Sequence, residues 1–328
     1  MQDLDNLCTK LIGLSHAEST YANIQAHCRA YCHFCQAFQL TPFPVSQLTI
    51  FRYIAYLVQL GRAFGTITNH LSSIKHVHKF LGYPLTWDTN YHYKLMLKGC
   101  QRFLGVAPKR KSAMMPHILY DIYCLLDLRT PLHSALWALC LVAFFTFLRK
   151  SNLVLERANR PSPKVPLRQD LCFHAKGATL TIRATKTIQF KQRYLSIPLP
   201  YIPDSPLCPV TALRNHLQIN DLNDKSDGKP LFSVILPRSG EHAPITAAKF
   251  SAFIQRAIKT LGLDPGQFSP HSFRRGGATF AFSCSVPSEL IQRQGDWHSD
   301  AYLVYLEMSD AQKLQASETM ARRIQPLF

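Results

Sequence analysis

The stretch HSFRRGGATF, residues 271–280, combines a histidine and two arginines with small residues. If this stretch forms a helix, His271 and Arg274 lie at positions i and i+3 and project together, whereas Arg275 points about 100° away. The pair could then present two hydrogen-bond donors to one anion. The small residues that follow, Gly276, Gly277 and Ala278, would allow a neighbouring element to approach closely. Alone the pattern is weak, because any basic helix can contain it.

The pattern becomes informative when it is combined with three further stretches, all four being taken in chain order. They are TFLRKSNLV with Arg149, RATKTI with Lys186, and QGDWHSDAYLVYLE with Trp297, His298 and Tyr305. An arginine ending an apolar helix, a lysine in a β-turn, an HxxR helix and a later tyrosine together resemble the tyrosine recombinases of the phage-integrase superfamily. LRKSNL and HSFRRGGA are most similar to motifs of eukaryotic DIRS/Ngaro and Crypton mobile elements. The resemblance runs from about residue 113 to 310, and before it only a helical DNA-clamping architecture is shared.

This resemblance implies a role for each side chain. A phosphodiester repels nucleophiles and its transition state carries more negative charge, so Arg149 and Arg274 would form a clamp of fixed cations. Tyr305 would attack phosphorus while His271 takes its proton, which leaves the tyrosine bonded to a 3′ DNA end. Lys186 would give a proton to the departing 5′ oxygen. One phosphoester replaces another, so we expect no ATP, no metal and no other cofactor.

The segment before the tyrosine departs from the family pattern. Family members place a histidine or tryptophan directly after the glycine that precedes the nucleophile by ten residues, and here Asp296 follows Gly295. Trp297 comes next. We expect Trp297 or His298 to take over the hydrogen-bonding and packing role against the phosphate.

Two other positions leave choices open. The residue three past Arg149 is commonly acidic in bacterial members and is Asn152 here, whose carbonyl oxygen could still hold that arginine. Tyr302 is a rival nucleophile because it lies three residues from Tyr305, on the same helical face. The spacing from the glycine favours Tyr305.

Apolar residues recur at helical spacing through the N-terminal third of the chain. The predicted helices cover residues 19–38, 45–60, 66–81 and 90–104. Residues 1–107 are therefore interpreted as a helical core-DNA-binding domain, similar to a SAM-like bundle. A basic linker follows at 108–115, where Lys109, Arg110 and Lys111 could grip phosphates, form a nuclear import signal or simply be solvated.

Residues 116–328 form the expected catalytic domain. Its predicted helices cover residues 116–128, 131–147, 209–219, 246–261, 271–283 and 287–294. GATLTIRATKTIQFKQRYLSIPL alternates apolar and polar residues as a small antiparallel sheet does, and LFSVIL could add a short strand. We therefore predict a mainly α (α+β) fold, in which a helical bundle and a mixed helical catalytic domain close around duplex DNA as a C-shaped clamp.

The charge indicates a polyanionic partner. The chain has 37 Lys+Arg against 20 Asp+Glu, a formal charge of +17, and double-stranded DNA fits this excess. A membrane partner is not expected, because the apolar run Leu132–Leu148 is too short and carries His133, Ser134 and Thr146, which favours a buried helix. MQDLDNLCTKLIGL lacks the basic start of a secretory signal, so we expect a reducing compartment.

The ten cysteines are scattered, which argues against a disulfide framework in a chain of this length. Cys28, Cys32 and Cys35 share a helix face in HCRAYCHFC. Without a second ligand pair at a recognisable spacing, a core stripe is a better interpretation than a zinc site.

Further DNA contacts are predicted at Lys75, Lys79 and Arg275. The lysines flank His76 and His78 in SSIKHVHKF, where a plain exposed face is the alternative. Because family members work as tetramers that exchange a C-terminal helix, residues 308–328 could serve that exchange. The resemblance and the basic charge also imply a nuclear location.

Two rival functions stay open. A DNA-binding protein descended from such an enzyme could retain the site without turnover, and Asp296 keeps that alternative alive. A type IB topoisomerase shares the Arg, Lys, Arg, His, Tyr logic, but the HSFRRGGA match argues against it.

Overall fold

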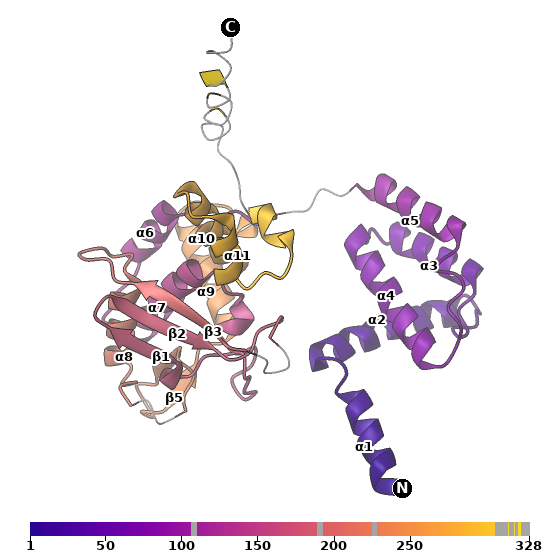
Figure 1. The fold of residues 1–328 in the computed structure, drawn as a ribbon, viewed down its shortest axis with the longest axis horizontal. Coiled ribbons are helices and arrows are strands. Elements are labelled where there is room, and N and C mark those ends of the chain that lie inside the picture. Colours follow the sequence, from indigo (N-terminus) through magenta and orange to yellow (C-terminus); the bar gives the residue numbers. More distant parts are fainter. Residues whose placement is uncertain are drawn as a thin grey trace. The chain divides into compact units, whose positions relative to one another are not determined.

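The computed structural model describes residues 1–105, 110–188, 193–224 and 228–305, with single positions 314, 318, 321 and 322. The chain divides into two compact units, Met1–Lys109 and Arg110–Phe328 (Figure 1). The division falls inside the linker predicted at 108–115. Each unit has its own buried apolar core, as separate domains require.

Helices make up all the regular structure in the described part of the N-terminal unit. They are α1 (Gln2–Gly13), α2 (Glu18–Ala37), α3 (Gln47–Gln59), α4 (Phe64–Phe80) and α5 (Tyr91–Leu104). Helices α2 to α5 begin and end within two residues of the predicted bounds. Their core includes Ile50, Ile54, Ile67 and Ile74. Helix α1 was not predicted, and no residue of it is buried.

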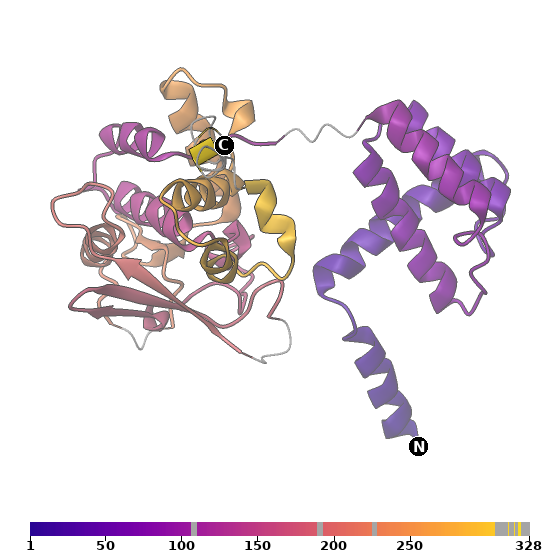
Figure 2. The same cartoon turned by 45° about the horizontal axis from the view of Figure 1, so that its top comes forward.

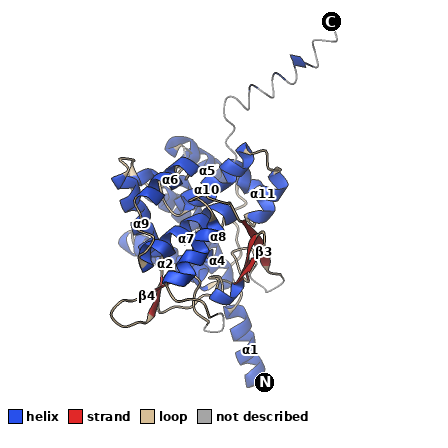
Figure 3. Ribbon diagram, turned by 90° about the vertical axis from the view of Figure 1, so that its left-hand side faces the viewer, coloured by secondary structure: helices blue, strands red, loops and turns tan. Residues whose placement is uncertain are grey.

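The C-terminal unit combines helices with two small sheets (Figure 3). Its helices are α6 (Pro116–Cys124), α7 (Pro131–Thr146), α8 (Pro209–Ile219), α9 (Ala247–Thr260), α10 (His271–Ser283) and α11 (Ser288–Gln294). Short 3₁₀ helices are η1 (Lys150–Asn152), η2 (Arg168–Asp170), η3 (Pro265–Gln267) and η4 (Asp300–Tyr305). This mainly helical architecture confirms the predicted fold class.

The larger sheet lies along one side of this unit, with helices over one of its faces (Figure 2). Its strands β1 (Leu171–His174), β2 (Gly177–Ile182) and β3 (Leu195–Pro200) run antiparallel in the order β1-β2-β3. A second antiparallel pair joins β4 (Ser233–Ile235) to β5 (His242–Pro244). Strand β5 was not predicted. The segment between β2 and β3 carries Lys186.

Helix α7 lies at the centre of the C-terminal core. The Thr130 hydroxyl caps it by accepting a hydrogen bond from the His133 N–H, and Pro131 occupies its first turn. Of its 16 residues, all but four are buried, which confirms the predicted core helix. It ends at Phe147, whose φ of 53° is left-handed, and Arg149 follows two residues later. No helix in the described ranges is long and apolar enough to cross a membrane.

Two glycines allow α10 to pack closely. A Cβ atom on Gly277 would lie 2.1 Å from the carbonyl oxygen of Phe144 in α7. A Cβ atom on Gly276 would lie 1.9 Å from the Met114 carbonyl oxygen, and the Met114 N–H donates to the Ser272 carbonyl at 2.9 Å. These contacts confirm the predicted close approach and identify the neighbours as α7 and the segment before α6.

We expect Gly277→Ala to destabilise the protein, because its methyl group would collide with the α7 backbone. The loss should reach about 3 kcal/mol in urea unfolding, at the upper end of overpacking effects. The control is Gly99→Ala in α5, where nothing lies within 4 Å of the added Cβ. That variant should gain about 0.5–1 kcal/mol of helix propensity. Equal unfolding midpoints for the two variants would contradict this account of α10.

Candidate active site

The predicted catalytic residues come from neighbouring segments of the C-terminal unit. Arg149 directly precedes η1, Lys186 lies between β2 and β3, His271 and Arg274 belong to α10, Trp297 and His298 lie between α11 and η4, and Tyr305 ends η4. Helix α10 packs against α7, α11 and η4. The fold therefore brings the ends of these elements to one region.

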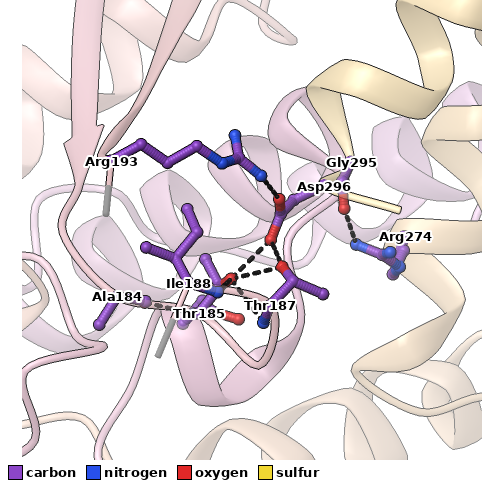
Figure 4. A network of polar contacts seen from close by, with 9 residues as sticks. Ala184, Thr185, Thr187, Ile188, Arg193, Arg274, Gly295 and Asp296 are labelled. Carbon is purple, nitrogen blue, oxygen red and sulfur yellow. Dashed lines mark hydrogen bonds and ion pairs between the residues drawn. The ribbon is translucent and has the colours of Figure 1, made fainter. Parts of the chain in front are cut away.

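Arg274 is held on several sides and is only 1% exposed. Its Nη1 donates to the Gly295 carbonyl at 2.8 Å (Figure 4) and to the Phe147 carbonyl at the end of α7. Its guanidinium carbon lies 3.6 Å from the centre of the Trp297 ring, an arrangement that cation–π attraction favours. These contacts fix the guanidinium plane. They also shield it, so direct contact with a phosphate requires local opening.

A tight turn at residues 295–297 supplies two of those contacts. Asp296 has a left-handed φ of 52°, which folds the next side chain back over the preceding residue. A Cβ atom on Gly295 would lie 1.7 Å from Cζ3 of Trp297, so only glycine fits beneath the ring. Trp297 is buried, whereas His298 is exposed. Trp297 therefore packs against Arg274, whereas the contact of Trp297 or His298 with the phosphate stays a prediction.

His271 begins α10 and stays exposed. Neighbouring atoms still shield part of its ring from water. This desolvation, followed by the positive charges of Arg274, Arg149 and Arg275, holds the pKa of His271 below its ordinary value. A histidine with a lowered pKa is mostly neutral at pH 7 and can accept a proton. The structure thus places a basic group within the field of both predicted clamp arginines.

Lys186 is exposed in a turn built by its threonine neighbours. The Thr185 hydroxyl oxygen accepts from the N–H groups of Thr187 and Ile188, each at 3.0 Å. The Thr185 N–H donates to the Ile188 carbonyl at 3.2 Å. This part of the turn has a defined local geometry. Residues 189–192 lie outside the described ranges.

Asp296 anchors that turn from the other side of the site. Its carboxylate accepts from the Thr185 hydroxyl at 2.5 Å, from the Thr187 hydroxyl, and from Arg193 Nη2 at 2.6 Å (Figure 4). Burial by itself raises the pKa of Asp296, but hydrogen bonds from these three donors and the Arg193 charge outweigh it, so the pKa lies below its ordinary value. The carboxylate is therefore ionised at neutral pH.

Asn152 also holds the lysine turn. Its side-chain amide donates to the Ala184 carbonyl at 3.0 Å, and the residue is 1% exposed. This bond runs to the backbone two residues before Lys186. That the Asn152 oxygen could hold Arg149 stays a prediction.

The two tyrosines are in different situations. Tyr302 is 6% exposed and its ring centre lies 6.2 Å from that of Trp297. It belongs to a small apolar cluster with Phe147 and Ile291, so it is a core residue here, which argues against its role as the rival nucleophile. Tyr305 is the last residue of η4, and its side chain lies outside the described part of the structure.

Several predicted DNA-contacting residues of the C-terminal unit are engaged within the protein. Arg275 is 9% exposed and its Nη1 donates to the Lys111 carbonyl at 2.6 Å. The Lys111 ammonium donates to the Gly266 carbonyl. These bonds join the linker to α10 through Arg275 and to η3 through Lys111, and the DNA contacts expected of both residues stay predictions. Arg110 is exposed, and Lys109 lies outside the described residues.

The lysine and histidine stretch of α4 is also partly internal. Lys75 pairs with Asp88 at 3.5 Å and lies 5.0 Å from the centre of the Tyr93 ring. His78 is buried, and its Nδ1 accepts from the Val45 N–H at 3.2 Å. The expectation that this face is exposed was therefore wrong for His78, and Lys75 has intramolecular partners. Lys79 is exposed.

The cysteines of α2 do not form a ligand cluster. Cys35 is buried in the N-terminal core, and Cys28 donates to the Ser73 carbonyl at 3.6 Å. Nowhere in the described ranges do three His, Cys, Asp or Glu side chains gather as metal ligands do.

Comparison with known proteins gives one sequence relative and several structural ones. The chain is 23% identical over 282 residues to an integrase/recombinase xerD homologue of Selenomonas ruminantium, a match that spans 85% of this chain and 78% of that protein. No protein-family profile matches. The sequence match supports placing the chain in the tyrosine recombinase and integrase superfamily.

Solved structures share the fold. The Tn1549 transposon integrase in complex with transposon right end DNA matches with a TM-score of 0.63 at 14% identity, over 96% of this chain and 98% of that one. A lambda integrase dimer bound to a COC′ core site matches with a TM-score of 0.60 at 16% identity, over 93% and 94%. The XerH site-specific recombinase bound to palindromic difH substrate matches with a TM-score of 0.59 at 13% identity, over 84% and 72%.

Replacing Trp297 by alanine should destabilise the protein far more than replacing its neighbour His298. Trp297→Ala removes a buried ring that stacks on Arg274, so it should cost about 3–5 kcal/mol in urea unfolding. The matched change His298→Ala, one residue away and exposed, should stay within about 0.5 kcal/mol of wild type. A larger loss from His298→Ala than from Trp297→Ala would reverse the assignment of the packing role.

Proposed function

We propose that this chain is a site-specific DNA recombinase that cleaves and rejoins strands through a 3′-phosphotyrosyl intermediate on Tyr305. The observation that carries the proposal is that one turn holds both Arg274 and the segment that carries Lys186. The turn at residues 295–297 holds Arg274 through Gly295 and Trp297, and it holds the Lys186 turn through Asp296. A phosphoryl-transfer site needs cations and a proton donor fixed relative to one another.

In the proposed reaction, charge is supplied by the protein itself. Arg149 and Arg274 neutralise the non-bridging oxygens of the scissile phosphate as negative charge accumulates on them. Because Arg274 is shielded in this structure, DNA binding must open its surroundings. His271 takes the proton of Tyr305 as the phenolic oxygen bonds to phosphorus.

The leaving group is then protonated. The bond from phosphorus to the 5′ oxygen breaks with its electron pair on oxygen, and the Lys186 ammonium supplies the proton. Attack by another 5′ hydroxyl on the phosphotyrosyl bond reverses the same steps. One phosphoester replaces another, so no external energy source is needed.

We also propose how the protein meets its DNA. The formal charge of +17 supports binding dominated by phosphate contacts, with affinity that falls steeply as salt rises. A homo-tetramer on two DNA segments is a part of the proposal that rests on the family resemblance alone, and a nuclear location rests on that resemblance and the basic charge.

The proposed origin is a mobile element. LRKSNL and HSFRRGGA favour the DIRS/Ngaro or Crypton type, and the transposon integrase among the structural relatives is consistent with a mobile-element enzyme. Flanking terminal or split repeats around the gene would support this origin. Those flanks are also the first candidate substrates.

The test is a covalent trap on nicked duplexes that tile the sequences flanking the gene. A nick just beyond the cleavage point releases the short leaving strand, so the protein–DNA adduct should accumulate and survive SDS. Wild type and Tyr302→Phe should form this adduct, and Tyr305→Phe should not, because only Tyr305 is the proposed nucleophile.

Other outcomes would contradict the proposal in different ways. Salt-sensitive DNA binding without any adduct across all flanking duplexes would favour a DNA-binding protein that has kept the fold. An adduct lost in Tyr302→Phe but retained in Tyr305→Phe would move the nucleophile. Relaxation of an arbitrary supercoiled plasmid by a monomer would favour a type IB topoisomerase.

A further inference from the structure

We infer that Asp296 is a positioning residue that fixes the proton-donating Lys186 turn relative to the Arg274 end of the site. This inference rests on the proposed recombinase function and deepens it. Asp296 stands where the resembled family has histidine or tryptophan, and its contacts give it a different task from either of those rings.

The carboxylate of Asp296 accepts three hydrogen bonds, all from one segment. Its Oδ2 accepts from the hydroxyls of Thr185 and Thr187, and its Oδ1 accepts from Arg193 (Figure 4). The Asp296 side chain has no exposed surface, while that of Arg193 is 46% exposed. A carboxylate only accepts hydrogen bonds and offers about four lone-pair sites, so it suits three converging donors.

These partners lie on both sides of Lys186 in the sequence. Thr185 and Thr187 are its immediate neighbours, and Arg193 lies just before β3, at the far end of the same segment. Asp296 therefore ties this segment at both ends. A lysine in an exposed turn otherwise samples many positions, and proton transfer requires it within hydrogen-bond reach of the leaving oxygen.

The same residue is linked covalently to the groups that hold the arginine. Gly295 accepts from Arg274 through its carbonyl, and Trp297 stacks on the Arg274 guanidinium. Asp296 lies between Gly295 and Trp297, which both contact Arg274, so it resists a shift of the lysine turn relative to Arg274. The leaving-group end and the phosphate-clamp end of the site share one three-residue anchor.

The charge of Asp296 does not oppose DNA binding in this arrangement. An unpaired carboxylate beside a phosphate would repel it, but Asp296 is buried and forms an ion pair with Arg193 at 2.6 Å. Only the arginine side of this pair reaches solvent. The anchor therefore presents positive charge outward.

Asp296→Asn is the direct test because it changes the acceptors with little change in shape. Asparagine tolerates the left-handed backbone at this position, but its NH₂ group would face donors that now find a carboxylate oxygen. With ordinary DNA, strand cleavage should slow by about 10- to 100-fold, the range expected when a catalytic group is misplaced by about 1 Å. The melting temperatures of wild type and Asp296→Asn show whether the variant has lost stability.

Sulfur in place of the scissile 5′ oxygen separates positioning of the lysine from a general structural effect. The bond from phosphorus to sulfur then breaks with the electron pair on sulfur, and a thiolate leaves without a proton because it is a far weaker base than an alkoxide. On this DNA, Asp296→Asn and Lys186→Ala should both cleave within a few-fold of wild type. Arg149→Ala should be slow on both DNAs, since its proposed role does not involve the leaving group.

A second variant protects the test against misfolding of Asp296→Asn. Thr187→Val removes one donor to Asp296 and should show the same selective slowing on oxygen DNA, in a milder form. Its matched control is Thr181→Val within strand β2, which should cleave both DNAs at the wild-type rate.

The inference is overturned if sulfur rescues Lys186→Ala but not Asp296→Asn, or if Asp296→Asn cleaves oxygen DNA as fast as wild type. The proposed function fails separately, and this inference with it, if wild type cleaves neither DNA. Rescue of Lys186→Ala and Asp296→Asn alike, with Arg149→Ala unrescued, is the result that supports the positioning role.

Discussion

The left-handed turn at Asp296 is the constraint on which the rest of the candidate site depends. A φ of 52° at this residue folds the Trp297 ring over Gly295, and no larger residue fits at position 295. The same geometry points the Gly295 carbonyl at Arg274 and the Asp296 carboxylate at the lysine turn. One local backbone conformation thus sets the positions of groups that lie far apart in sequence.

The predicted catalytic arginines lie on packed elements, whereas the predicted catalytic lysine lies in an exposed turn. The arginines are set by core elements, because Arg149 follows the buried helix α7 and Arg274 belongs to α10, which Gly276 and Gly277 seat against its neighbours. Lys186 instead sits in an exposed turn whose position depends on side-chain hydrogen bonds. Polar anchors are directional and can be broken and remade more readily than a packed core. This division suits a clamp whose arginines are carried by packed elements and a proton donor that must reach a leaving group on bound DNA.

The sequence predicted the packed elements well and the polar partnerships poorly. Helices with an apolar face were located within two residues in the N-terminal unit, because burial leaves a periodic signal. Helix α1 also has apolar residues at helical spacing, Leu4, Leu7 and Leu11, but none of them is buried, and this helix was not predicted. The described side-chain partners of Asn152, Arg275 and His78 come from distant segments, which periodicity does not reveal. The sequence offered one sign of the role of Asp296, the two threonines beside Lys186, whose hydroxyls can donate to a carboxylate. Asp296 was instead considered only as a departure from the family pattern.

The most direct test of the central claim is a double-mutant cycle of cleavage rates on ordinary DNA, made from wild type, Asp296→Asn, Lys186→Ala and the double variant. Effects of two residues that act through one group are not additive, whereas independent effects multiply in the rate. If Asp296 acts by placing Lys186, the double variant should cleave no more slowly than Lys186→Ala alone. A double variant slowed by the product of the two single losses would contradict the claim and show that Asp296 acts on the reaction by another route.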